Sequence, residues 1–236
     1  MSKAKYTFLT IFLLSYMALL GCNDGNKQNT ESMDQAGSLK FLALGDSYTI
    51  GESVAESERW PVQLVTALKK GGFSIAAPEI IATTGWTTDE LQKGIEKASP
   101  KPPYDLVSLL IGVNNQYRGR SLEEYKKQFE ALLVQGILFA GGKAEKVFVV
   151  SIPDYGVTPF AADRNPEKIG KEIDAFNSAA EAISKKLGVA FVNITPGSKE
   201  AANDPELVAN DGLHPSGKMY TQWVSKILPV VESMIK

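Results

Sequence analysis

Residues 41–51, FLALGDSYTIG, are the starting point for predicting the fold. The apolar run Phe41–Leu44 is typical of a buried strand, and it stops at Gly45-Asp46-Ser47. Gly, Asp and Ser are turn formers, so this stretch alone predicts only a strand followed by a turn. It also places the hydroxyl of Ser47 at a strand end, and the rest of the chain decides whether that hydroxyl has a chemical role.

Short apolar runs alternate along the chain with longer amphipathic ones. The short runs are the predicted strands: Lys40–Leu44, Glu79–Ala82, Leu106–Ile111, Lys146–Ser151 and Ala190–Asn193. Helix-start signals stand between or after them: Trp60-Pro61, Thr87 with Glu90, Ser121 with Glu124, Pro166, and Pro215 or Ser216. This order predicts an α/β fold with a five-stranded parallel sheet covered by helices on both faces. In such sheets ligands collect outside the carboxyl ends of the strands.

The N-terminus has the composition of an export signal. Lys3 and Lys5 precede the apolar run Tyr6–Leu20, which is short for a membrane span, so residues 1–21 are predicted to be a cleaved signal peptide. Leu19-Leu20-Gly21-Cys22 is similar to a bacterial lipobox, which predicts lipidation of Cys22. The protein is then an exported lipoprotein, held by its anchor on a periplasmic or extracellular face. The alternative is an ordinary leader with an accidental cysteine.

The sequence after Cys22 divides into a tether and a body. Residues 22–38 are almost wholly polar, which is typical of a flexible segment, and residues 39–236 have the length of one domain. The chain carries a net charge of −2 and no basic block, which argues against a nucleic-acid partner. With one histidine in the whole chain and no cysteine in the body, the sequence predicts no metal site and no cofactor.

A serine hydroxyl needs a neighbouring base before it becomes a nucleophile. The one histidine, His214, stands just before the last predicted helix, with Asp211 three residues upstream. A carboxylate there can accept the imidazole N–H and fix its tautomer, which is the third role in a Ser-His-Asp triad. Ser47, His214 and Asp211 are therefore the candidate catalytic residues, while Asp46 is predicted only to hold its turn by a local hydrogen bond.

Four short blocks together resemble the GDSL or SGNH hydrolase superfamily, and they occur in the order typical of that family. The blocks are Gly45-Asp46-Ser47-Tyr48, Gly85 in TTGWTTDEL, Gly112-Val113-Asn114-Asn115, and Asp211-Gly212-Leu213-His214-Pro215. The resemblance implies a three-layer, flavodoxin-like α/β/α sandwich. It also implies that Ser47 is the nucleophile, that His214 is the base, and that Gly85 and Asn114 help to form the oxyanion hole. The chemistry of acyl transfer calls for the same groups, because negative charge builds on the carbonyl oxygen and preorganised donors must stabilise it. The candidate donors are the backbone N–H groups of Ser47 and Gly85 and the side-chain amide of Asn114.

Two features depart from common patterns. Asn115 stands where the third block usually has Asp, which predicts adjusted loop packing and retained activity. The segment around Ser47 is not Gly-x-Ser-x-Gly, which argues against an α/β-hydrolase elbow.

The predicted strand ends carry aromatic side chains and one arginine that are candidates to contact the substrate. The candidates for substrate contact are Tyr48, Trp86, Tyr117, Arg118 and Tyr155; for most of these side chains, packing in the core or a loop is an equally good explanation. The resemblance implies a serine esterase acting on a lysophospholipid, a short acyl ester or a thioester. A carbohydrate O-acetyl esterase is the alternative enzyme, and a ligand-binding lipoprotein without turnover is the alternative of another class.

Overall fold

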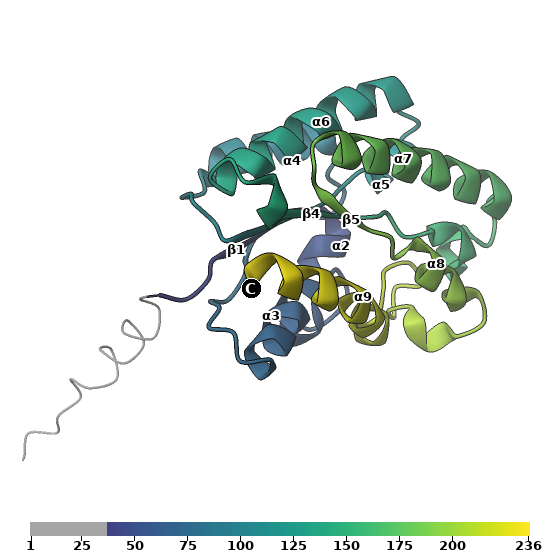
Figure 1. Cartoon of the computed structure of the whole chain (residues 1–236). Helices are drawn as coiled ribbons and strands as arrows, with labels where there is room; N and C mark the ends of the chain where they lie inside the picture. Colours follow the sequence, from purple (N-terminus) through teal and green to yellow (C-terminus); the bar gives the residue numbers. More distant parts are fainter. Residues whose placement is uncertain (1–36) are drawn as a thin grey trace, which may run out of the picture. The chain divides into compact units, whose positions relative to one another are not determined.

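The computed structural model describes residues 37–236 (Figure 1). The predicted signal peptide, Cys22 and most of the predicted tether lie outside the described residues. Leu39 forms a parallel bridge with Ile75, so ordered pairing begins at the predicted start of the body. Within residues 37–236 no helix is both long enough and apolar enough to cross a membrane.

The sheet has five parallel strands in the order β2-β1-β3-β4-β5. Their bounds are β1 Phe41–Gly45, β2 Glu79–Ala82, β3 Leu106–Leu110, β4 Val147–Val150 and β5 Ala190–Val192. Every residue of β1, β3 and β4 is buried, as expected for strands covered on both faces. The predicted five-stranded parallel sheet is confirmed.

Helices cover both faces of this sheet (Figure 1). On one face α3 (Trp60–Lys70) packs against α9 (Gly217–Ile235), and on the other α6 (Leu122–Phe139) packs against α4 (Thr88–Ala98) and α7 (Pro166–Lys186). The predicted helix starts are confirmed. Glu90 accepts from the backbone N–H of Thr87, and the hydroxyls of Ser121 and Ser216 accept the N–H groups of Glu124 and Met219.

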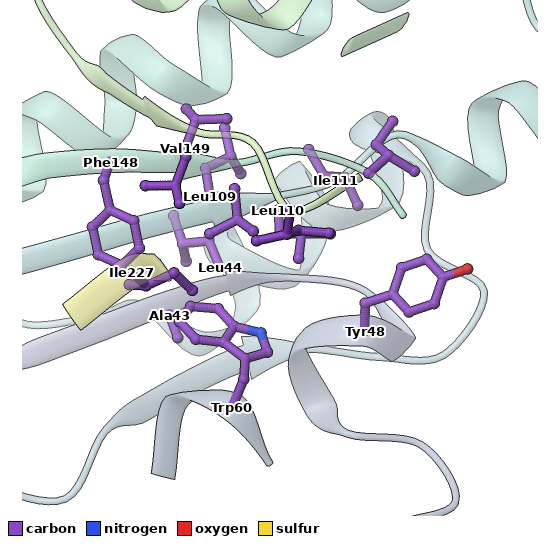
Figure 2. Close-up of a cluster of buried hydrophobic side chains, with 14 of the residues drawn as sticks. Ala43, Leu44, Tyr48, Trp60, Leu109, Leu110, Ile111, Phe148, Val149 and Ile227 are labelled. Atoms are coloured by element: carbon purple, nitrogen blue, oxygen red, sulfur yellow. The ribbon is translucent and has the colours of Figure 1, made fainter. Parts of the chain in front are cut away.

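The α3 and α9 layer is joined to the sheet through large apolar side chains. Trp60, Phe148 and Ile227 gather beside Ala43 of β1 (Figure 2), and the rings of Trp60 and Phe148 lie 6.2 Å apart. All four side chains are fully buried. This packing fixes α9, and with it the His214 segment that immediately precedes α9, against the middle of the sheet.

Candidate active site

Three strands end side by side and in register at one edge of the sheet. Gly45 at the end of β1 lies opposite Ala82 of β2 and Leu110 of β3. The chain runs from β1 to β2 on one side and then returns to β3 on the other, so β1 lies at the topological switch point where parallel sheets bind ligands. One predicted residue follows each of these strands: Ser47 after β1, Gly85 after β2 and Asn114 after β3. All three therefore lie at the same edge of the sheet.

The sequence Gly45-Asp46-Ser47 is explained by the turn that it forms. A Cβ on Gly45 would lie 2.5 Å from the carbonyl oxygen of Leu110, so a side chain has no room there. Asp46 is the N-cap of the short helix α2 (Ser47–Ile50), and its Oδ1 accepts from the N–H of Tyr48 at 3.1 Å. The predicted local role of Asp46 is confirmed. The helix places Ser47 at its first position, where its own N–H has no intrahelical partner.

One pocket of about 160 Å³ brings most of the predicted residues together. Ser47, Gly85, Asn114 and His214 all line it, although they come from four separate segments of the chain. Ser47 and His214 are almost fully buried within the protein, so water has little access to the pair except through this pocket. The other lining residues are Tyr48, Thr84, Val113, Tyr117, Tyr155, Phe160 and Leu213.

Asp211 holds the imidazole of His214 from outside the pocket. Its Oδ2 lies 2.6 Å from His214 Nδ1, and its Oδ1 accepts the backbone N–H groups of Leu213 and His214, each at 2.9 Å. Burial raises the pKa of Asp211, but hydrogen bonds from Ser53, the imidazole and these two N–H groups outweigh it and hold the pKa well below its usual range. The carboxylate is therefore ionised at neutral pH, as the third member of a triad requires.

The two predicted oxyanion-hole residues are each held in place. The Asn114 Nδ2 donates to the carbonyl oxygen of Trp86 at 3.0 Å, which fixes the plane of its amide. Gly85 has φ +87°, a conformation that favours glycine, and its carbonyl oxygen accepts from Arg118 Nη2 at 2.6 Å. The Nη1 of Arg118 is paired with Glu90 at 3.1 Å.

Two of the predicted substrate contacts lie outside the pocket lining. Arg118 bonds to Gly85 and Glu90, so it supports the loop that carries Gly85. The Trp86 indole packs against Gly94 of α4 so closely that a Cβ on Gly94 would collide with it. Sequence spacing placed both residues near the strand ends correctly but did not indicate which way their side chains point.

Asn115 takes a structural part that explains its departure from the family pattern. It is fully buried; its Oδ1 accepts the N–H of Thr88 at 3.1 Å, and its Nδ2 donates to the Thr88 hydroxyl at 2.7 Å. An amide can accept and donate at once, whereas a carboxylate only accepts. Asn115 thus joins α5 (Val113–Tyr117) to the start of α4, in agreement with the expected change in loop packing.

Aromatic rings form one wall of the pocket. Tyr117, Tyr155 and Phe160 lie with ring centroids 6.1 to 6.4 Å apart, and the Arg164 guanidinium lies 5.0 Å and 4.8 Å from the rings of Tyr117 and Phe160. Tyr48 is buried, as Tyr155 is, and packs its ring 5.8 Å from the imidazole of His214. Tyr48 therefore supports the predicted base as well as lining the pocket.

Several residues of the site were not predicted. Thr84 and Leu213 flank predicted residues, so chain adjacency was the available signal for them. Ser53 and Arg164 have no local sequence signal, because their partners lie far away along the chain. Among residues 37–236 no cluster of three or more His, Cys, Asp or Glu side chains has the arrangement of a metal site.

Solved structures share this fold. TesA superposes with a TM-score of 0.67 at 17% identity, covering 83% of this chain and 99% of TesA. The esterase EstA from Pseudoalteromonas sp. superposes with a TM-score of 0.64 at 16% identity, covering 82% of this chain and 97% of EstA. Axe2, an acetylxylan esterase from Geobacillus stearothermophilus, superposes with a TM-score of 0.61 at 19% identity, covering 83% of this chain and 95% of Axe2. No curated protein sequence matches the chain.

The sequence also matches the model of a protein family over most of its length. The match covers residues 43–222, which include Ser47, Gly85, Asn114, Asp211 and His214. It therefore spans the three strand ends and the His214 segment that the fold brings to one edge. The chain belongs to the GDSL-like lipase/acylhydrolase family, a family of ester-hydrolysing enzymes.

Proposed function

We propose that the protein is a serine esterase that hydrolyses carboxylic esters of small acyl groups through an acyl-enzyme on Ser47. The observation that carries the proposal is the single pocket lined by Ser47, Gly85, Asn114 and His214, with Asp211 bonded to the far side of the imidazole. A serine, a base, an orienting carboxylate and donors for an oxyanion are the parts that acyl transfer needs.

The proposed reaction proceeds through an acyl-enzyme in two steps. Ser47 Oγ attacks the ester carbonyl carbon and gives its proton to His214 Nε2, while the carbonyl oxygen becomes an anion facing the Ser47 and Gly85 N–H groups and Asn114 Nδ2. As the C–O bond to the alcohol breaks, the imidazole returns the proton to the leaving oxygen. Water then attacks the acyl-enzyme with the same imidazole as base, and the acid is released.

The pocket favours a short acyl group. Its volume, about 160 Å³, is close to that of an engineered cavity of ~150 Å³ that holds benzene. The walls away from the predicted oxyanion donors are mostly apolar or aromatic, formed by Val113, Leu213, Phe160 and the tyrosines. An acyl chain of up to about six carbons is expected to fit, and a longer chain has to extend out of the pocket mouth.

A carbohydrate O-acetyl esterase is a second candidate, favoured by the rim of the pocket. Tyr117 is 45% and Phe160 39% exposed, so two aromatic rings stand beside the pocket with free surface. Tyr117 combines an apolar ring with a polar tip, which suits an amphipathic ligand, and Phe160 adds a second apolar ring. In this version the pocket takes only the acetyl group, and the sugar rests on the two rings.

Hydrolysis of p-nitrophenyl esters from acetyl to decanoyl tests the proposal. The full chain is expected to hydrolyse short esters best, and Ser47→Ala is expected to lose the activity. Ser225→Ala is the matched control, because Ser225 is exposed on α9 and bonds only within that helix. An inactive wild type on every ester would favour the ligand-binding alternative. A sharp optimum at acetyl, with activity on acetylated xylo-oligosaccharides, would favour the second candidate.

We also propose, from the N-terminal sequence alone, that the protein is exported and anchored to a membrane through a lipid on Cys22. The body would then act on esters outside the cytoplasm. Incorporation of a labelled fatty acid into the wild type, and its loss in Cys22→Ser, is the expected result. Equal labelling of both proteins, or none in the wild type, would contradict the anchor.

A further inference from the structure

The turn that follows α2 is bound to the predicted nucleophile. The N–H groups of Gly51 and Glu52 both donate to the carbonyl oxygen of Ser47, each at 3.0 Å. Gly51 has φ +71° and Ser53 has φ +64°, so the chain turns back sharply within three residues. The position of Ser53 is therefore tied to that of Ser47.

Ser53 reaches the carboxylate that holds the imidazole. Its Oγ donates to Asp211 Oδ2 at 2.6 Å, across 158 residues of sequence, and this oxygen is also the partner of His214 Nδ1. The other oxygen, Oδ1, is bonded to two backbone N–H groups. Ser53 is thus the side chain that joins His214 in fixing Oδ2.

The backbone of Ser53 is held in a conformation that serine rarely adopts. A left-handed conformation costs a non-glycine residue roughly 1–2 kcal/mol and persists where the surroundings impose it. Among the described residues the other non-glycine residue with a positive φ is Ser99, at +48°. Ser99 is the C-cap of α4, where a left-handed residue is common, and its N–H donates to Ile95. Ser53 ends no helix, and its hydroxyl is directed at Asp211.

The same turn also reaches the loop of Gly85. The Thr84 hydroxyl donates to Glu52 Oε2, and Thr84 directly precedes Gly85. Neighbouring residues of one short turn therefore contact both the orienting carboxylate and the segment that supplies an oxyanion donor. The turn is bonded to Ser47, to Asp211 and to Thr84 at once.

We propose that Ser53 is a positioning residue of the active site. Its hydroxyl fixes Asp211 Oδ2, and through this oxygen it fixes the ring of His214 toward Ser47. The inference rests on the proposed function for its effect on catalysis, while the contact itself can be tested independently of any substrate.

Ser53→Gly is the informative variant, because glycine accepts the backbone conformation and lacks the hydroxyl. We expect kcat on a short p-nitrophenyl ester to fall about 10-fold with KM little changed, because a hydrogen bond to a charged group is lost at the orienting carboxylate. The melting temperature is expected to change little, since the relief of backbone strain is offset by the lost hydrogen bond and by the greater freedom of glycine in the unfolded chain. Ser99→Gly makes the same replacement away from the site, and its kcat is expected to match that of the wild type.

A spectroscopic measurement separates positioning from general stability. The chain contains one histidine, so the downfield proton resonance of an imidazole N–H bonded to a carboxylate belongs to His214. We expect this resonance to shift or broaden in Ser53→Gly and to stay in place in Ser99→Gly. An unmoved resonance, or a kcat equal to wild type, would overturn the role of Ser53. If the wild type cleaves no ester, the proposed function fails, and the resonance still tests whether Ser53 holds Asp211.

Discussion

Asp46 carries a buried carboxyl group that directly precedes the predicted nucleophile. The residue is fully buried, Oδ1 accepts one N–H from Tyr48, and Oδ2 has no hydrogen-bond partner among the described residues. Burial raises the pKa of Asp46 from 3.8 to about 7, although the N–H bonds favour the ionised form. In the folded protein the carboxyl is therefore neutral below about pH 7.

This raised pKa makes the folding free energy depend on pH. Between pH 3.8 and 7 the unfolded chain has lost the Asp46 proton and the folded chain keeps it, so raising the pH favours unfolding. At ~1.4 kcal/mol per pKa unit, the full penalty is about 4 kcal/mol, of which about 3 kcal/mol falls between pH 5 and 8. Asp46→Asn keeps a cap acceptor for the Tyr48 N–H and cannot ionise. The variant should therefore lack this penalty.

Urea unfolding of wild type and Asp46→Asn at pH 5 and pH 8, followed by tryptophan fluorescence, measures the effect. Comparing the two proteins at each pH cancels the titration of all other groups. Asp46→Asn is expected to gain about 3 kcal/mol relative to the wild type between pH 5 and pH 8. A stability difference that is the same at both pH values would refute the argument, because the carboxyl would then not be held neutral by burial.

Three further changes have expected outcomes. Asn114→Ala should lower kcat ~10²–10³-fold with KM within a few-fold, because one oxyanion donor is lost; steady-state kinetics on a short ester measures it. Asp211→Asn should lower kcat by roughly 10³–10⁴-fold without unfolding, because the imidazole of His214 is no longer held in the productive tautomer; a loss below 10-fold would argue against a triad. Gly112→Ala should lower the free energy of unfolding by about 2–3 kcal/mol in urea, because φ is +130° and the new Cβ would lie 2.6 Å from the Tyr125 ring.

Local patterns were enough to predict the sheet and the helix starts. The strand Glu79–Ala82 was predicted from its short apolar run, and the caps at Thr87 and Ser121 from capping chemistry; both signals act over a few residues. The short helices α2 and α5 were not predicted. Each has five residues or fewer, too few to show helical periodicity.

The parts of the site that were missed depend on contacts between distant segments. The bond from Ser53 to Asp211 joins residues 158 apart in the sequence, one in the turn after α2 and the other just before α9. Arg118 differs from Ser53, because the sequence predicted that Arg118 lies beside the site but did not predict the direction of its side chain. That direction is set by Glu90 and the Gly85 carbonyl oxygen, which belong to other elements.

The order of the site along the chain has a consequence for biosynthesis. Ser47 is among the first residues of the body to be made, whereas His214 comes just before α9, the last helix. Trp223 of α9 packs its ring 6.3 Å from that of Tyr48, so docking of this helix brings the His214 segment to the pocket that Ser47 also lines. A nascent chain that ends before His214 therefore carries Ser47 without the predicted base, and the proposed esterase activity would report completion of the whole domain.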